Sequence, residues 1–491
     1  MAHTVPPLKD PSLFIEKCFV DGEWASAKSG EVFDIYDPSN GKLIGSCPDF
    51  NIADTERAIV AARAAFPLFR STPVRERARM LRRWYQLMVE NAEDIATLIT
   101  WENGKPLADA RGEATFAANF LEWFSEEASR VYGDTIPSSI PGNRVITIKE
   151  PVGVCAFITP WNFPAAMITR KLGPALAAGC TVVAKLAPET PFTANAIAEL
   201  ARRAGIPKGV INLLTTNKNV TQVGEILTTH PVIRKVSFTG STPVGKLLMK
   251  QASSTVKKVS WELGGNAPFI VFDDADIEGA VTGAITSKFR SSGQTCVCAN
   301  RIYVQKGIYV KFARKFAEKV KAFKVGPGFQ DGVTHGPLIH SRAVDKVHQH
   351  VKDAQSKGAV VVIGGKKANE LGESFYYPTV LTNMTGNMRL AREETFGPVA
   401  GLFSFETEKE VVELANCSDV GLAAYFYASD VRRVMRVAEA LEVGMVGVNT
   451  GLIADVASPF GGIKESGFGR EGSKYGIDEF LHVKTITYGG I

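Results

Sequence analysis

Cysteine is scarce in this sequence, and the few cysteines do not suggest a disulfide framework. The chain of 491 residues has 7 cysteines, at positions 18, 47, 155, 180, 296, 298 and 417. An odd, scattered set is typical of a reducing compartment, whereas disulfide-stabilised proteins carry regularly spaced pairs. We therefore expect a cytoplasmic protein that is stabilised by its hydrophobic core.

Long apolar runs and a strong net charge are also absent. No stretch reaches the roughly 18 apolar residues of a membrane span, and residues 1–14 show neither a secretory signal pattern nor an Arg-rich presequence. The net charge of +5 is spread over 491 residues, which is too weak to indicate nucleic-acid binding. We expect neither a membrane nor a nucleic-acid partner, and two to four domains of about 150 residues each.

The pattern that is present is an alternation of strands and helices. Between residues 152 and 272, apolar runs such as "VGVCAFI" and "TVVAKLA" are separated by helical patterns. This alternation predicts an α/β protein with a parallel, doubly wound sheet. It resumes after residue 300, so a second α/β unit begins near residue 262. Residues 130–150 and the C-terminal tail look like two extended strands without a local partner, and we expect them to form a subunit contact.

The stretch "FTGSTPVGKLL" (238–248) resembles a phosphate-binding loop between a strand and a helix. A nucleoside-triphosphate P-loop has Ser or Thr after its Lys to hold Mg²⁺, but Leu247 follows Lys246 here. A glycine turn at a helix N-terminus can still bind the pyrophosphate of a dinucleotide, with Gly240 at the turn and Ser241 as a donor. A plain strand–helix turn is the other interpretation.

Two further loops carry polar side chains at strand ends. "PWNFP" places Asn162 on a stiff loop, where its amide could stabilise an oxyanion or cap the next helix. "ELGG" places Glu262 at the end of an apolar strand, where it could be a general base or an ordinary surface residue.

The stretch "SSGQTCVC" (291–298) places Cys296 and Cys298 on a loop that leads into a strand. Metal binding would need nearby partner ligands, and His348 and His350 face different sides of a predicted helix, so we expect no metal site. A disulfide across one residue would be strained. A lone thiol on a loop between two α/β units favours a nucleophile.

These motifs, in their order and spacing, resemble the aldehyde dehydrogenases. The resemblance rests on "PWNFP", "FTGST", "ELGG", "GQTC", "EETFGP" and "PFGGIKESGFGRE" and covers residues 15–491. "FRSSGQTCVCAN" and "REGSKYGIDEF" are most similar to the succinate-semialdehyde dehydrogenases, enzymes of the γ-aminobutyrate (GABA) degradation pathway. The resemblance implies a Rossmann-type dinucleotide-binding domain (1–129 and 151–261), a catalytic domain (262–470) and a β oligomerisation element (130–150 and 471–491), in a homodimer or homotetramer.

The resemblance also implies a role for each motif. Cys296 attacks the aldehyde carbon, Asn162 and the Cys296 backbone N–H stabilise the oxyanion, and Glu262 activates water to hydrolyse the thioester. Further residues are implied on the cofactor side: Trp161 lines the cleft, Lys185 binds the adenosine ribose, and Glu394 and Phe396 hold the nicotinamide ribose. A non-catalytic scaffold of the same fold is disfavoured because all three catalytic residues are present.

Substrate and cofactor choice follow from less general positions. Arg170 and Arg290 match the arginines that bind the substrate carboxylate in this family. Relatives also use a serine where this chain has Ala454 followed by Asp455, and Ser458 is a candidate replacement. The resemblance therefore implies oxidation of succinate semialdehyde to succinate. The alternative substrates are glutarate semialdehyde or an uncharged aldehyde.

The cofactor is expected to be NADP, with NAD also accepted. NAD-preferring relatives often carry Glu where this chain has Pro188, and losing that carboxylate removes its repulsion of a 2′-phosphate. Glu189, the neighbouring residue, weakens this argument. Cys298 is either a partner for reversible oxidation of Cys296 or a small apolar filler.

Overall fold

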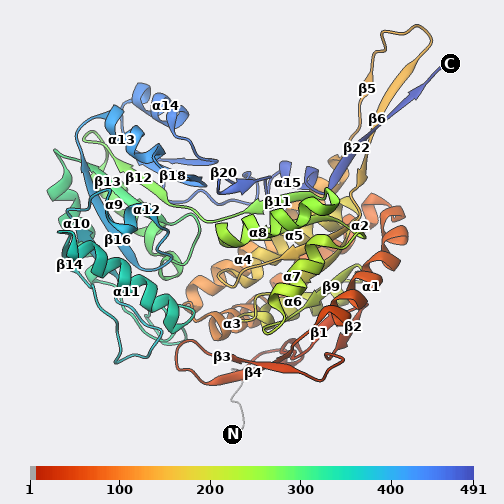
Figure 1. Cartoon of the computed structure of the whole chain (residues 1–491), viewed down its shortest axis with the longest axis horizontal. Helices are drawn as coiled ribbons and strands as arrows, with labels where there is room; N and C mark the ends of the chain where they lie inside the picture. Colours follow the sequence, from red (N-terminus) through yellow and green to blue (C-terminus); the bar gives the residue numbers. More distant parts are fainter. Residues whose placement is uncertain (1–6, 491) are drawn as a thin grey trace.

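Two α/β lobes and a projecting arm make up the computed structural model, which describes residues 7–490 (Figure 1). Each lobe is built around its own sheet, and the two sheets lie side by side with the chain passing between them near residue 262. The predicted α/β class is confirmed. In the part of the chain that is described, no helix is long and apolar enough to cross a membrane.

The first lobe contains an eight-stranded sheet whose five central strands are parallel. In sheet order the strands are β2 (Glu23–Ala25), β1 (Cys18–Val20), β9 (Ile211–Leu214), β8 (Thr181–Lys185), β7 (Val154–Ile158), β10 (Ile233–Thr239), β11 (Lys258–Glu262) and β21 (Gly467–Phe468). The chain runs outward from β7 through β8 to β9 and then crosses to β10 on the other side. This switch point between β7 and β10 is where a doubly wound sheet leaves a ligand crevice.

Helices cover both faces of this sheet, so its central strands are buried and almost entirely apolar, as in parallel sheets generally. The helices are α1 (Ile52–Ser71), α2 (Val74–Glu90), α3 (Ala92–Asn103), α4 (Leu107–Glu127), α5 (Pro164–Ala178), α6 (Pro191–Arg203), α7 (Val220–Thr229) and α8 (Thr242–Ala252). All 15 residues of α5 are buried. This burial includes two cations, Arg170 and Lys171, which therefore need partners.

The second lobe contains a seven-stranded sheet that is parallel except for β14 at one edge. Its strands in order are β14 (Val360–Ile363), β15 (Thr379–Thr382), β16 (Val399–Phe405), β13 (Ala299–Gln305), β12 (Ala267–Val271), β18 (Ala423–Tyr427) and β19 (Met445–Val448). The helices of this part of the sequence are α9 (Ile277–Phe289), α10 (Tyr309–Lys321), α11 (Ser341–Ser356), α12 (Arg389–Arg392), α13 (Glu408–Asn416), α14 (Val431–Ala440) and α15 (Tyr475–Asp478).

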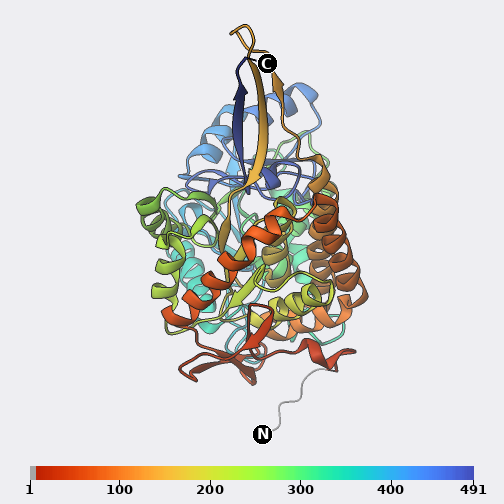
Figure 2. The same cartoon turned by 90° about the vertical axis from the view of Figure 1, so that its right-hand side faces the viewer.

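A three-stranded sheet forms the arm, which stands clear of both lobes in two perpendicular views (Figures 1 and 2). β6 (Arg144–Pro151) lies between β5 (Thr135–Ile136) and β22 (Leu481–Tyr488) and pairs with β22 along its whole length. Neither extended segment has a partner nearby in the sequence, as expected, and the two segments, which were assigned to one element, pair with each other. Sequence patterns do not reveal this pairing because the strands lie more than 300 residues apart in the chain.

Short elements complete the fold. The remaining strands are β3 (Val32–Tyr36) with β4 (Leu43–Pro48), and β17 (Val420–Gly421) with β20 (Ile463–Lys464), and the 3₁₀ turns are Pro11–Leu13, Ala128–Arg130, Ser253–Thr255 and Arg290–Gly293. β21 follows the catalytic motifs in sequence but pairs with β11 of the first lobe. The chain therefore returns to the first sheet before it enters the arm.

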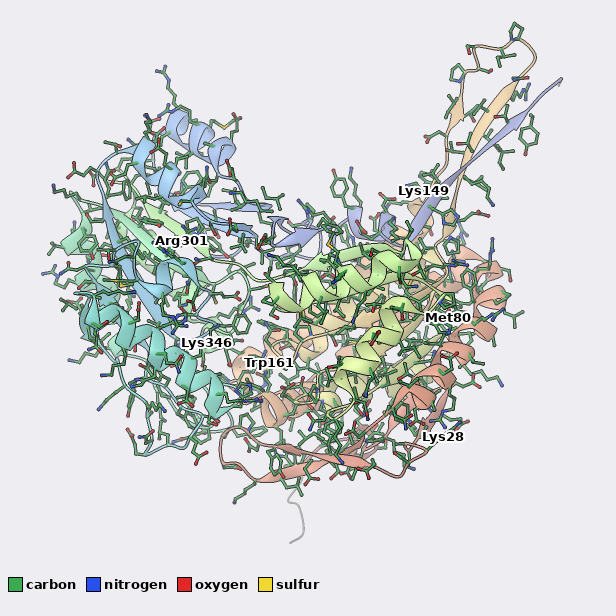
Figure 3. The ribbon with its side chains drawn as sticks, viewed as in Figure 1. Lys28, Met80, Lys149, Trp161, Arg301 and Lys346 are labelled. Atoms are coloured by element: carbon green, nitrogen blue, oxygen red, sulfur yellow. The ribbon has the colours of Figure 1, made fainter. Side chains whose placement is uncertain are left out.

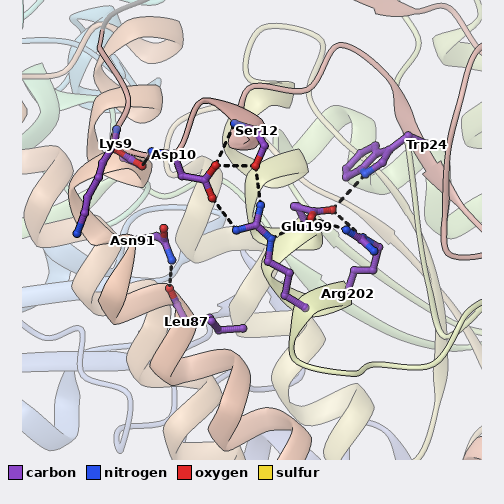
Figure 4. Close-up of polar contacts among 10 residues, drawn as sticks. Lys9, Asp10, Ser12, Trp24, Leu87, Asn91, Glu199 and Arg202 are labelled. Atoms are coloured by element: carbon purple, nitrogen blue, oxygen red, sulfur yellow. Dashed lines mark hydrogen bonds and ion pairs between the residues drawn. The ribbon is translucent and has the colours of Figure 1, made fainter.

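Polar contacts fasten the N-terminal segment to helix α6 (Figure 4). Glu199 accepts hydrogen bonds from Trp24 Nε1 at 3.2 Å and from Arg202 Nε at 2.9 Å. Arg203 extends the cluster to Asp10 at 2.6 Å and to Ser12 at 2.7 Å. These contacts attach the N-terminal segment to helix α6 of the first lobe.

Candidate active site

The loops that follow β7, β10 and β11 meet the second lobe around a cavity of about 320 Å³. Its lining includes eight residues predicted from the sequence: Trp161, Asn162, Gly240, Ser241, Glu262, Cys296, Glu394 and Phe396. Figure 3 shows Trp161 on the first lobe and Lys346, which also lines the cavity, on the facing helix α11. These eight residues therefore border one hollow between the lobes, whereas the other predicted residues, Arg170, Lys185, Pro188, Arg290, Cys298 and Ser458, do not line it.

Asn162 is buried and held from both of its ends. Its side-chain Nδ2 donates to the backbone carbonyl of Gln294 at 3.0 Å, and its backbone carbonyl accepts from Lys105 Nζ at 2.8 Å. It does not cap the next helix, because the N-cap position of α5 is Phe163. Among the described residues, one N–H of the Asn162 amide makes no hydrogen bond, which is the arrangement that an oxyanion-stabilising amide would need.

Glu262, the last residue of β11, is 4% exposed and is not a surface carboxylate. Its Oε2 accepts from Arg170 Nη2 at 3.1 Å. Its Oε1 is buried without a hydrogen-bond partner of ordinary length among residues 7–490, and the Cys296 thiol lies close enough to the carboxyl to hydrogen-bond with it and influence its pKa. Burial raises the pKa of Glu262, and the neighbouring Arg170 opposes that rise. A carboxyl with one oxygen fixed and the other free can exchange a proton at the cavity.

Cys296 lies at the same cavity, on the loop between α9 and β13. Burial and the nearby Glu262 charge raise the pKa of its thiol well above the usual value. The resting thiol is therefore protonated at neutral pH and needs a base to become a nucleophile. Cys298 is 8% exposed, and burial raises the pKa of its thiol as well.

The cofactor side of the cavity has the features of a dinucleotide site. Ser241 is the N-cap residue of α8 but makes no side-chain cap, so the first N–H groups of an 11-residue helix face the hollow. Thr239 Oγ1 is buried without a partner among the described residues. The ring of Phe396 meets Trp161 edge to face, with centroids 5.7 Å apart. Free donors beside a helix N-terminus fit a pyrophosphate.

Glu394, opposite these residues, accepts from the Gly265 N–H at 3.2 Å. Burial raises its pKa to about 7, so the carboxyl changes its charge near neutrality.

Lys185 ends β8, the strand next to β7 in the sheet, and its Nζ donates to the Leu186 carbonyl at 3.0 Å. Burial lowers its pKa to about 8, with Glu189 opposing. Pro188 is half-buried in the same loop.

The two predicted substrate arginines have different surroundings. Arg290 is half-buried in a smaller pocket with Thr295, Cys298 and Tyr425, and it makes no ion pair within residues 7–490. Arg170 is 2% exposed and forms ion pairs with Glu262 and Glu471. Ser458 is exposed on the loop after β19, near Asp455.

Several functional candidates could not be found from the sequence. Lys105 and Glu113 support the Asn162 loop, and Lys171 and Glu471 lie behind Glu262. Glu471 is the last residue of the "GFGRE" motif, and this motif was the only feature of the sequence that could have indicated a role for it. Lys105 lies in the short loop between α3 and α4, and Glu113 lies on α4, in sequence without a recognisable motif, so only the fold reveals their role. Lys246 pairs with Glu465 at 2.7 Å, outside the phosphate turn, which disfavours the P-loop interpretation.

Comparison with known proteins identifies the family of this chain. The profile of the aldehyde dehydrogenase family matches residues 24–486. The NADP(+)-dependent succinate-semialdehyde dehydrogenase 1 of Schizosaccharomyces pombe is 57% identical over 485 residues, which are 98% of this chain and 97% of the relative. The 3-sulfolactaldehyde dehydrogenase of Pseudomonas putida is 56% identical over 484 residues, 99% of each chain.

A solved structure agrees equally well. The crystal structure of succinate-semialdehyde dehydrogenase from Burkholderia pseudomallei superposes with a TM-score of 0.97 at 53% identity, covering 99% of this chain and 100% of that one. The chain belongs to the aldehyde dehydrogenase family, as its motifs predicted. Similar relatives act on different aldehydes, so family membership alone does not fix the substrate.

Proposed function

We propose that this aldehyde dehydrogenase oxidises succinate semialdehyde to succinate, with NADP preferred over NAD. The observation that carries the proposal is the free guanidinium of Arg290 in the pocket next to the Cys296 loop. A half-buried guanidinium that pairs with no carboxylate between residues 7 and 490 is suited to the distal anion of an acidic aldehyde. The two relatives described above support the same substrate class, because the aldehydes for which they are named carry a distal carboxylate or sulfonate.

The proposed chemistry begins at Cys296. Glu262 takes the thiol proton, and the thiolate sulfur bonds to the aldehyde carbon. The resulting oxyanion is stabilised by the free N–H of the Asn162 amide and by the Cys296 backbone N–H. A nicotinamide dinucleotide bound in the cavity supplies the hydride acceptor. Trp161 would line the cleft of this cofactor, and Glu394 and Phe396 would hold its nicotinamide ribose. Lys185 would bind its adenosine ribose, and Gly240 and Ser241 would bind its pyrophosphate.

Oxidation of the carbon leaves a thioester on Cys296. Glu262 first releases the thiol proton to solvent. It then takes a proton from water, the water oxygen attacks the thioester carbonyl, and the C–S bond breaks, so that the acid leaves and the Cys296 thiolate is restored. Sulfur suits both steps, because it is a good nucleophile and a good leaving group. The raised pKa of Glu262 places this carboxyl closer to the range in which it can accept and return protons near neutrality.

The NADP preference rests on the loop after β8. Pro188 leaves no carboxylate at the position that would oppose a 2′-phosphate, and Lys185 offers a nearby cation. The likeness to the Schizosaccharomyces pombe enzyme, which is named as NADP(+)-dependent, supports this choice. Glu189 in the same loop favours some use of NAD.

Location and assembly are part of the proposal. We place the enzyme in the cytoplasm and expect a homodimer or homotetramer whose contacts include the arm. The three-part domain division given above remains a proposal, as does reversible oxidation between Cys296 and Cys298.

Initial rates test the function directly. Succinate semialdehyde and butanal, its uncharged analogue, are each compared with NADP and with NAD. We expect succinate semialdehyde to exceed butanal by about 10²-fold in kcat/KM, since a desolvated charge contact contributes a few kcal/mol. In Arg290→Gln the preference should disappear through a higher KM for the acid alone. Equal rates for both aldehydes with the parent enzyme would contradict the substrate assignment.

A further inference from the structure

A buried histidine contacts the loop that carries Glu394. His350 lies on α11, one helical turn after Lys346, and its side chain is fully buried. Its Nδ1 lies 3.2 Å from Thr395 Oγ1, and its Nε2 lies 3.2 Å from Glu393 Oε2. One imidazole therefore contacts both the residue before Glu394 and the residue after it.

The two contacts determine the tautomer of the imidazole. Burial lowers the pKa of His350 to about 4, so the ring is neutral at pH 7 and has one donor and one acceptor. Hydrogen bonds from Arg389 lower the pKa of Glu393, which is therefore ionised and can only accept. Nε2 then carries the proton and donates to Glu393, while Nδ1 accepts from the hydroxyl of Thr395.

The backbone between these contacts directs Glu394 away from the histidine. Glu393 has φ −111° and ψ 139°, and successive side chains along an extended segment point to opposite sides. Glu393 and Thr395 meet His350, whereas Glu394 lines the cavity and accepts from the Gly265 N–H at 3.2 Å. A residue that holds both neighbours of Glu394 can thus set the direction of its carboxyl through the backbone.

The next residue of the loop has a strained backbone. Phe396 has φ +55°, a left-handed conformation that side chains rarely adopt and that persists only where the surroundings fix it. α11 also packs closely against Gly397, because a Cβ atom at this glycine would clash with Val347. The helix therefore supports the loop on both sides of the strained residue.

The two hydrogen bonds of His350 differ in importance. Glu393 is also held by Arg389, whose Nε and Nη2 donate to its two oxygens at 3.1 and 2.9 Å. Thr395 is 1% exposed, and its hydroxyl has no other hydrogen-bond partner among residues 7–490. Loss of the imidazole would leave this buried hydroxyl unsatisfied, which is unfavourable unless the loop moves.

We propose that His350 is a positioning residue for the Glu394 carboxyl, acting through the hydroxyl of Thr395. This inference rests on the proposed function, in which Glu394 and Phe396 hold the nicotinamide ribose of the dinucleotide. A displaced Glu394 no longer fixes the orientation of that ribose, so the productive geometry for hydride transfer is reached less often. The adenosine half of the cofactor, which we place near Lys185, should be unaffected.

Two amide variants separate the two ring nitrogens. His350→Asn puts a carbonyl oxygen near the position of Nδ1 and can still accept from Thr395, whereas His350→Gln puts its amide near Nε2 and can still donate to Glu393. His350→Leu removes both contacts, and Thr395→Val removes only the hydroxyl. We expect His350→Leu, His350→Gln and Thr395→Val to be impaired, while His350→Asn stays within about twofold of the parent.

Calorimetric titration measures the effect without catalysis. The ligands are NADPH and adenosine 2′,5′-bisphosphate, the half of NADP that lacks the nicotinamide ribose. In the three impaired variants we expect the dissociation constant of NADPH to rise about 10-fold, as for loss of a hydrogen bond to a charged group, and that of the bisphosphate to stay within about twofold. A variant that is merely less folded loses binding sites without a change in either constant.

Rapid mixing tests the same role in the first turnover, with saturating NADP and succinate semialdehyde. The rate constant for formation of reduced cofactor does not depend on the fraction of folded enzyme. We expect it to fall about 10-fold in His350→Leu and to be restored in His350→Asn. If His350→Leu does not fold, Thr395→Val, which exchanges a hydroxyl for a methyl group, takes its place in both experiments.

Two results would overturn the proposal. One is parent-like NADPH affinity and first-turnover rate in His350→Leu and Thr395→Val, and the other is an equal loss of affinity for NADPH and the bisphosphate. Failure of the proposed function appears separately, in the parent, as a lack of preference for succinate semialdehyde over butanal, and the titrations still test His350. If the parent binds NADH and not NADPH, NADH and AMP replace the two ligands.

Discussion

At the scale of single residues, burial shifts the pKa values of two groups on the cofactor side, Lys185 and Glu394, toward neutrality. Lys185 has a pKa of about 8, so it is charged below that pH and neutral above it. A 2′-phosphate gains from the charged form, whereas a 2′-hydroxyl does not. The choice between NADP and NAD should therefore depend on pH.

We predict that the dissociation constant of NADP rises as the pH increases from 7 to 9.5, while that of NAD changes little. Titration of the intrinsic tryptophan fluorescence with each dinucleotide measures both constants. The Lys185→Gln variant should bind NADP about 10-fold or more weakly at pH 7, from loss of a charged hydrogen bond, and its affinity should no longer vary with pH. Parallel pH curves for NADP and NAD would show that Lys185 does not contact the 2′-phosphate.

At the scale of secondary-structure elements, two buried glutamates cap neighbouring helices in the same way. Glu113 accepts from Ala165 N at 2.9 Å at the start of α5, and Glu102 accepts from Phe192 N at 2.7 Å at the start of α6. Only Glu113 also pairs with Lys105, at 2.5 Å, which in turn holds the Asn162 carbonyl. The helix cap and the oxyanion loop are thus joined through one ion pair.

Glu113→Gln should lower both stability and activity. It leaves the Lys105 charge uncompensated, which costs about 3–5 kcal/mol, and it frees the Asn162 loop, so kcat should fall about 10-fold or more. Glu102→Gln is the matched control. Glu102 accepts from the backbone N–H groups of Phe192 and Thr193 through its two oxygens, so the amide keeps one of these bonds and loses the other. We expect this to cost about 1–3 kcal/mol of stability and to leave kcat unchanged. Urea unfolding and kcat at pH 7 measure both effects, and equal losses in the two variants would disprove the link to Asn162.

The sequence predicted the elements whose signals are local. The strands and turns around Asn162, Glu262 and Cys296 are short apolar runs followed by glycine or proline, and the structure has them there. The surroundings of Arg170 are different, because Glu471 lies 301 positions further along the chain and only tertiary packing brings the two together. In "MITRKLG" the two cations are equally compatible with a solvated helix face. Non-local partners of buried charges are the part of the site that a sequence pattern does not contain.

At the scale of the whole molecule, the arm exposes apolar side chains that a single chain leaves uncovered. Ile136 is 43% exposed, Ile148 is 36% exposed and Val483 is 61% exposed, all on the three-stranded sheet. β6 and β22 have 8 residues each, so at about 3.4 Å per residue they extend roughly 27 Å. A long projecting sheet with apolar side chains on its surface is typical of a surface that another chain covers.

We therefore expect Ile148→Lys combined with Val483→Lys to lower the molar mass measured by light scattering during size-exclusion chromatography, from that of an oligomer toward that of one chain. Both positions are exposed in the isolated chain, so the thermal midpoint of the separated chains should not fall because of lost core packing. Leu68→Lys is the control, since Leu68 on α1 is 77% exposed but lies outside the arm. An unchanged mass in the arm variant, or an equal loss of mass in the control, would exclude the arm as the subunit contact. A smaller assembly that keeps its kcat would show that each chain carries a complete active site, as expected from a cavity formed by residues of one chain.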